Sequence, residues 1–177
     1  MNALALAPNF FDIALERMRR WLVALAGLTT ALCTSFKVEL MEAKHDFTAG
    51  TGNAFFMMLF KQTALIVGTY GAATTNYANV TGNADELANG SGYTTGGVAL
   101  GNTTPLSTGT VAYTTPNGNA VWTVSTFTTR GCLVYNSTNG NRSVFVYDFG
   151  ADEPVVAGTF TVSMPVNASA TALLQLA

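Results

Sequence analysis

The last two thirds of the chain contain short apolar runs, and runs in which apolar and polar residues alternate, separated by stretches rich in Gly, Asn and Thr. Residues 54–60 (AFFMMLF) are almost wholly apolar, which predicts a strand buried on both faces. Residues 119–127 alternate between two moderately apolar faces, which predicts a second strand. Further strands are expected over residues 65–67, 96–101, 108–115, 132–136, 143–149, 158–164 and 171–176.

The spacing of these strands indicates the fold class. Eight or nine strands recur at intervals of roughly ten residues, which is typical of an antiparallel β-sandwich of jelly-roll or immunoglobulin-like type. The Asn139-Gly140 pair is a strong hairpin signal between the strands over 132–136 and 143–149. A turn at Pro105 is expected between the strands over 96–101 and 108–115, and residues 63–93 are mostly loop.

The N-terminal part differs from the rest, so the chain is divided into an extension over residues 1–35 and a β domain over residues 36–177. Asn9 can cap a helix that continues without proline to Cys33, and three arginines precede the apolar run that starts at Trp21. The run resembles a secretory signal, but it is too short to span a membrane, which needs roughly 20 residues. A processed signal, a docking helix and an upstream extension with a later start remain open. We favour a helix buried against other chains of an assembly.

Residues 35–47 predict a second, short helix, because their apolar positions recur at spacings of four, three and four. Ser35 is expected to cap it, and Lys44 and His45 to complement the dipole at its C-terminal end. The alternation over residues 36–40 also permits a strand.

Composition and charge narrow the function classes. Only 10% of residues are charged, against about 25% in an ordinary globular protein, and the mean hydropathy is +0.29. The formal charge is −2 and the isoelectric point about 5.2. No basic surface is therefore available for nucleic acid. Five basic and five acidic residues lie within residues 1–46, and only eight charged residues follow.

Candidate catalytic groups are few. His45 is the single histidine, it lies beside Asp46, and no Gly-x-Ser-x-Gly motif accompanies it, so a helix-capping or surface role is expected. Five acids near expected loops are interpreted as solvated turn residues and not as a glycosidase pair: Asp85, Glu86, Asp148, Asp152 and Glu153. The last three are the nearest candidate for a calcium site, but the same interpretation is favoured for them.

Other chemistry-bearing residues receive structural interpretations as well. The glycine-rich run over residues 90–97 is followed by no lysine, so it is expected to be a flexible entry into a strand and not a phosphate loop. Arg130 and Arg142 are expected to form salt bridges or carbonyl contacts within or between subunits. Cys33 and Cys132 have no metal-ligand spacing; two free thiols are favoured over one disulfide. No catalytic residue, cofactor or metal ligand is assigned, and an enzyme is not expected.

Several segments carry a resemblance to a group of known proteins. They include Trp122-Thr123, residues 127–136, Asn141-Arg142-Ser143-Val144, Tyr147-Asp148-Phe149-Gly150 and residues 157–162, with further similar pieces near residues 36–47, 56–60 and 90–98. These resemble small structural proteins of tailed bacteriophage particles, over roughly residues 36–177. The resemblance implies a location in the virion, after synthesis in the bacterial cytoplasm, as a head or tail component.

The composition agrees with such an assembly role. Hydrophobic residues make up 49% of the chain, and surplus apolar surface is usually covered by another subunit. We expect a homo-oligomer that also contacts major capsid or tail proteins, most simply as a decoration or cementing subunit of the capsid. A tail, baseplate or fibre subunit is the first alternative. A carbohydrate-binding surface module is the second, and it requires Trp122, Tyr93 and Tyr113 to line an exposed shelf; a hydrolase is the third.

Overall fold

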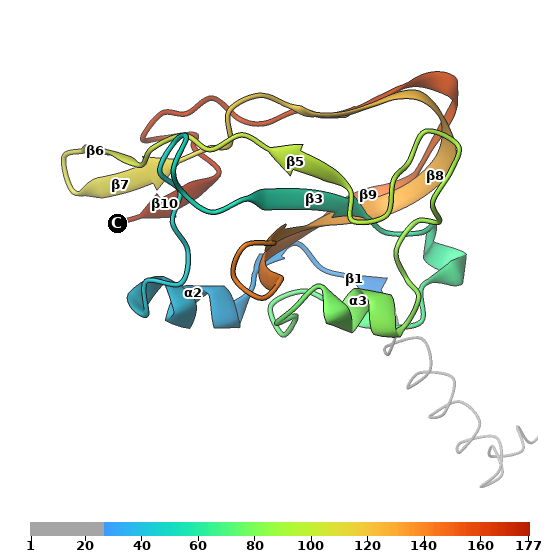
Figure 1. Cartoon of the computed structure of the whole chain (residues 1–177), viewed down its shortest axis with the longest axis horizontal. Coiled ribbons are helices and arrows are strands. Elements are labelled where there is room, and N and C mark those ends of the chain that lie inside the picture. The colour runs from blue at the N-terminus through green and yellow to red at the C-terminus, as the bar shows by residue number, and fades with distance from the viewer. Residues whose placement is uncertain (1–26) are drawn as a thin grey trace, which may run out of the picture.

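A computed structural model describes residues 27–177, and the protein is mainly β over this range. The central element is a five-stranded antiparallel sheet with strand order β2-β9-β8-β3-β5 (Figure 1). Its strands are β2 (Ala31–Leu32), β9 (Arg142–Val162), β8 (Ala120–Asn136), β3 (Phe55–Leu59) and β5 (Val98–Leu100).

Strands β8 and β9 dominate the topology. They form the expected hairpin, and Gly140 and Asn141 adopt positive φ in its turn. Each strand is much longer than expected, because two predicted strands are joined into one in both cases. Beyond the sheet they continue as a two-stranded ribbon, formed by residues 120–129 of β8 and 153–162 of β9, that curves back over the sheet (Figure 1). Register shifts with positive φ at Val124 and Ala157 mark β-bulges, which bend such ribbons.

Two smaller sheets flank the central one. A three-stranded antiparallel sheet has the order β10-β7-β6, from β10 (Leu174–Leu176), β7 (Val111–Thr114) and β6 (Leu106–Thr108). Its β6–β7 hairpin turns at Gly109, so the expected turn at Pro105 between neighbouring strands is wrong. The other sheet pairs β1 (Gly27–Leu28) with β4 (Thr69–Tyr70) in parallel.

Short helices lie along one side of the central sheet (Figure 1). Helix α2 spans Thr34–Met41, which confirms the helix expected there over the alternative strand. Its N-cap is Cys33, without a side-chain cap, so the expected role of Ser35 is wrong. A 3-10 helix, η1 (Thr63–Leu65), and helix α3 (Ala78–Gly82) lie within the expected loop, and η1 overlaps the strand wrongly predicted over residues 65–67.

The structure describes only the last part of the helix predicted near the N-terminus. Residues 27–32 form β1 and β2, so the helix expected to run to Cys33 is wrong over these residues. Strands β1 and β2 pair with β4 and β9, and Cys33 is fully buried in the core. The remainder of the expected helix and the apolar run before residue 27 lie outside the described residues.

The hydrophobic core lies around β3 and the adjoining part of β8. Met57, Met58, Leu59 and Phe60 are all fully buried, which confirms that this apolar run is covered on both faces. Side chains along a strand alternate between its two faces, so burial of consecutive residues requires cover on both faces.

Candidate functional site

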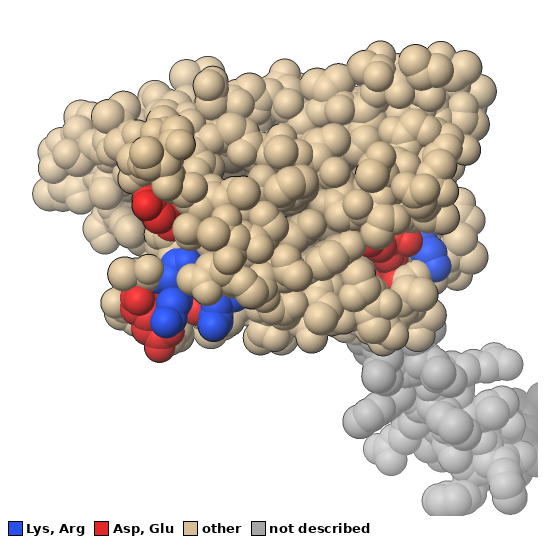
Figure 2. Space-filling model, viewed as in Figure 1, with Lys and Arg blue, Asp and Glu red and all other residues tan. Residues whose placement is uncertain are grey.

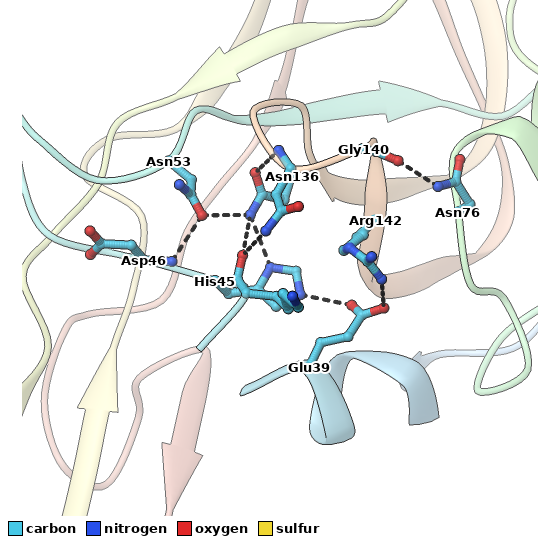
Figure 3. Close-up of polar contacts among 10 residues, drawn as sticks. Glu39, His45, Asp46, Asn53, Asn76, Asn136, Gly140 and Arg142 are labelled. Atoms are coloured by element: carbon cyan, nitrogen blue, oxygen red, sulfur yellow. Dashed lines mark hydrogen bonds and ion pairs between the residues drawn. The ribbon is translucent and has the colours of Figure 1, made fainter. Parts of the chain in front are cut away.

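The most connected polar cluster is centred on His45, just after helix α2. Its Nε2 lies 2.9 Å from Oε2 of Glu39, and its Nδ1 lies 3.1 Å from Nδ2 of Asn136 (Figure 3). Since the Asn136 amide nitrogen can only donate, His45 accepts at Nδ1 and donates from Nε2 to the carboxylate. Helix α2, the segment after it and the end of β8 thus meet at one buried ring.

Arg142, the first residue of β9, adds a cation to the cluster. Its Nη1 donates to Oε1 of Glu39 at 2.7 Å, so the buried carboxylate bridges a histidine and an arginine (Figure 3). Asn136 extends the network, because its Nδ2 also lies 2.8 Å from Oδ1 of Asn53 and its Oδ1 accepts from the backbone N–H of Asn139. Sequence reasoning does not single out Glu39 or Asn136; the one signal for them is that a buried lone histidine needs polar partners.

The burial and the hydrogen bonds of His45 indicate a structural role for this cluster. The side chain of His45 has no exposed area, which overturns the expected capping or surface role. Both ring nitrogens already take part in hydrogen bonds. Burial lowers the pKa of His45, outweighing the hydrogen bond to Glu39, so the ring stays neutral near pH 7. The His45 ring therefore connects helix α2 and the segment after it to the end of β8.

Two adjacent acids, Asp85 and Glu86, are also buried, so the expectation that both are solvated is wrong. The Asp85 carboxylate accepts from the backbone N–H of Val67 at 3.0 Å and of Gly68 at 2.7 Å, and from the Tyr70 hydroxyl at 2.6 Å. Asp85 therefore fastens the segment that follows η1 onto the core.

Glu86 fastens the glycine-rich segment in the same way. Its carboxylate accepts from the hydroxyls of Tyr77 and Tyr93 and from the backbone N–H of Gly96. Burial, reinforced by Glu86, raises the pKa of both tyrosines, which keeps them protonated as donors. Gly97 packs directly on the backbone of Met57. The run over residues 90–97 is therefore tied to the core, and its expected flexibility is wrong.

The acids of β9 do not form a reactive group. Asp148 is held by Arg130 through two hydrogen bonds of 2.6 and 3.2 Å, which confirms the salt bridge expected for this arginine. Burial opposes ionisation of Asp148, yet the contact with Arg130 keeps its pKa below the usual value. Asp152 accepts from Thr63, and Glu153 is exposed. Among residues 27–177 no three acids, histidines or cysteines gather as a metal site.

Two cavities among residues 27–177 differ greatly in volume. One, of about 20 Å³, lies between the central and three-stranded sheets and has the volume of a single water. The other is a wide, open hollow beside α3, of about 490 Å³, lined by Tyr70, Thr74, Asn79 and Asn83 among others. The Asn79 side chain accepts from the backbone of Thr75, and that of Asn83 donates to Tyr70. These amides are already used in holding the loop.

Both thiols and two of the three aromatics that a sugar-binding shelf would need are core residues, whereas the third, Tyr113, is only partly buried. Cys33 and Cys132 are free and buried, as expected, and burial raises the pKa of each thiol to about 12. Trp122 is 3% exposed and Tyr93 is 2% exposed, so the exposed aromatic shelf required for a carbohydrate module does not exist at these positions.

The surface is more distinctive than any cavity. Residues 87–129 and 154–177 contain no charged side chain. Figure 2 shows the consequence: the charged side chains lie in the lower half of the molecule in this view, except for one acidic side chain at mid-height on the side of the three-stranded sheet, and the ribbon along the top has none. We call the exposed side chains of these two segments the uncharged surface. Six large apolar side chains are exposed on it: Leu106, Val121, Val124, Val156, Val166 and Leu176.

Comparison with known proteins adds no relative: no family model, no curated protein and no solved structure matches the chain. Within the described residues, the helices are all too short or too polar to cross a bilayer.

Proposed function

We propose that the chain is a structural protein of a tailed-bacteriophage virion, in which it acts as a decoration subunit that cements the capsid through contacts with copies of itself and with the shell. The observation that carries the proposal is the uncharged surface, with its six exposed apolar side chains. The resemblance of residues 36–177 to phage structural proteins supports the location.

The physical argument concerns what happens when this surface is covered. Charged groups must lose their hydration on entering an interface, and interface cores are accordingly poor in charge. The uncharged surface offers Thr and Asn side chains, which can form hydrogen bonds with a neighbour, together with apolar side chains that gain from leaving water. A long-lived contact therefore costs little in desolvation.

The polar clusters support the same role. The buried side chains of His45, Asp85 and Glu86 each connect segments that are distant in the chain, and each is held by hydrogen bonds. A rigid body with a chemically inert surface suits a particle component more than a catalyst. We propose further that the fold is a distorted sandwich, supported by the ribbon that curves over the central sheet (Figure 1) and by Tyr93, which packs on Trp122 in the ribbon and accepts a hydrogen bond from Leu59 in β3.

The experiment is localisation in purified particles. Phage particles from a lysate of the producing bacterium are banded by density, probed with an antibody against the chain, and imaged with gold-labelled antibody. Label repeated over the head is the expected result. Label confined to the tail or fibres would replace the decoration role with the tail alternative. Particles that lack the chain while it stays in the soluble lysate would contradict a virion role altogether.

A further inference from the structure

The edges of the described sheets differ greatly in length. The central sheet ends in β2, of two residues, and β5, of three; the three-stranded sheet ends in β6 and β10, of three residues each. Short edges offer little backbone for a new strand. The ribbon is the exception, since β8 and β9 run there as a pair with no third strand among residues 27–177.

The two edges of the ribbon are not equivalent. On the β8 side, the backbone N–H of Thr126 donates to Ser91, and Gly92 packs so closely that an added Cβ would lie 2.6 Å from Oγ of Ser125. The loop before β5 thus covers that edge. On the β9 side, strand β2 reaches only Phe145 and Val146. Thr30 exchanges hydrogen bonds with the backbone of Asp148, and beyond Asp148 no strand of residues 27–177 pairs with this edge of β9.

Part of the open β9 edge is protected against pairing and part is not. Asp152, Glu153 and Pro154 lie in its first half, and charged residues and proline commonly prevent an exposed edge from pairing with another strand. The bulge at Ala157 follows. Residues 158–162 then carry no charge, no proline and no residue of positive φ; the extra residue of the register shift opposite Gly158 and Phe160 lies on β8, at Val124.

We infer that residues 158–162 of β9 pair antiparallel with the same residues of a second copy of this chain, about a twofold axis near Phe160. This pairing rests on the proposed assembly role and names the contact through which copies join. It converts two ribbons into a four-stranded sheet and gives the unpaired backbone groups partners.

The distribution of charge favours a second copy in this orientation. In an antiparallel pair, Glu153 of the two copies lie at opposite ends, each about 20 Å from the axis along an extended strand. In a parallel pair, they would face one another, and like charges directly opposite destabilise a sheet. The exposed Thr159 then meets Thr161 of the second copy, a favourable cross-strand pair.

The test measures mass by light scattering over a range of concentrations. The wild-type chain is expected to reach twice its 18.6 kDa mass. The variant Thr159→Lys/Thr161→Lys puts lysines opposite one another and is expected to weaken association at least tenfold. The matched control Thr51→Lys/Thr81→Lys adds the same charge at two exposed threonines outside the uncharged surface and is expected to associate like the wild type. Circular dichroism confirms that each variant is folded.

A second variant tests the register directly. In Thr159→Cys/Thr161→Cys, residue 159 of one copy lies opposite residue 161 of the other, so disulfides can form between copies. Mild oxidation is expected to give a covalent dimer, and a reductant is expected to separate it into monomers. A wild-type chain that stays monomeric, a Thr159→Lys/Thr161→Lys variant that associates unchanged, or loss of association in the Thr51→Lys/Thr81→Lys control would each overturn the pairing. Its failure would leave the chain in purified particles, whereas failure of the virion role would leave particles without the chain whatever its mass.

Discussion

Nε2 of His45 lies 2.9 Å from Oε2 of Glu39, at a position where the histidine side chain has no contact with solvent. The carboxylate also receives a hydrogen bond from Arg142, more than a hundred residues away along the chain. This contact joins helix α2 to the turn of the β8–β9 hairpin, so the helix and the hairpin are expected to unfold together.

Replacing Glu39 tests this link. Glu39→Gln removes the charge that His45 and Arg142 share, and we expect a loss of about 2 kcal/mol in the free energy of unfolding, as for a buried charged hydrogen bond. Urea denaturation followed by circular dichroism measures it. Glu42→Gln, at an exposed residue just after the same helix, is the control and should change stability by less than about 0.5 kcal/mol. Equal effects of the two changes would refute the link.

The pH dependence of stability follows from the lowered pKa of His45. In the folded state burial disfavours protonation, whereas in the unfolded chain the pKa returns to about 6.5. The unfolded state therefore binds more protons as the pH falls below about 6.5, and the free energy of unfolding decreases with falling pH. Urea titrations between pH 8 and pH 5 measure the slope. His45→Gln should flatten it, because the chain has no other histidine; an unchanged slope would contradict the assignment.

Glu86 provides a test of the loop attachment. In Glu86→Gln the neutral amide no longer accepts from Tyr77, Tyr93 and Gly96 as strongly, so the free energy of unfolding should fall by about 2 kcal/mol. Hydrogen exchange at the amide of Gly96 should accelerate. The exposed Glu153 offers the control Glu153→Gln, for which neither quantity should move. Unchanged exchange at Gly96 in Glu86→Gln would show that the carboxylate does not hold this loop.

A pair of glycines separates close packing from backbone preference. Both Gly97 and Gly109 have positive φ, at +81° and +60°. An added Cβ at Gly97 would lie 1.8 Å from the backbone oxygen of Met57, whereas at Gly109 it would meet nothing within 4 Å. Gly109→Ala should cost about 1 kcal/mol and Gly97→Ala at least about 3 kcal/mol. Thermal unfolding measures both, and similar costs would rule out the close packing of residue 97 on β3.

The sequence alone determined that the protein is mainly β, together with several local features. The apolar run over residues 54–60 indicates a strand covered on both faces, and Asn139-Gly140 locates the hairpin, because both signals depend on residues adjacent in the chain. The low charge after residue 86 is likewise a property of the sequence itself. All three follow from local backbone preference and composition.

Tertiary structure decided which strands are continuous and which polar residues are buried. Nothing near His45 or Glu86 in the sequence distinguishes a buried group from a solvated one, since their partners come from segments distant in the chain, such as Asn136 and Arg142 for His45. Whether an edge of the ribbon stays open also depends on a loop folding over β8 and not over β9. Burial and pairing are relations between remote segments, so only the folded chain fixes them.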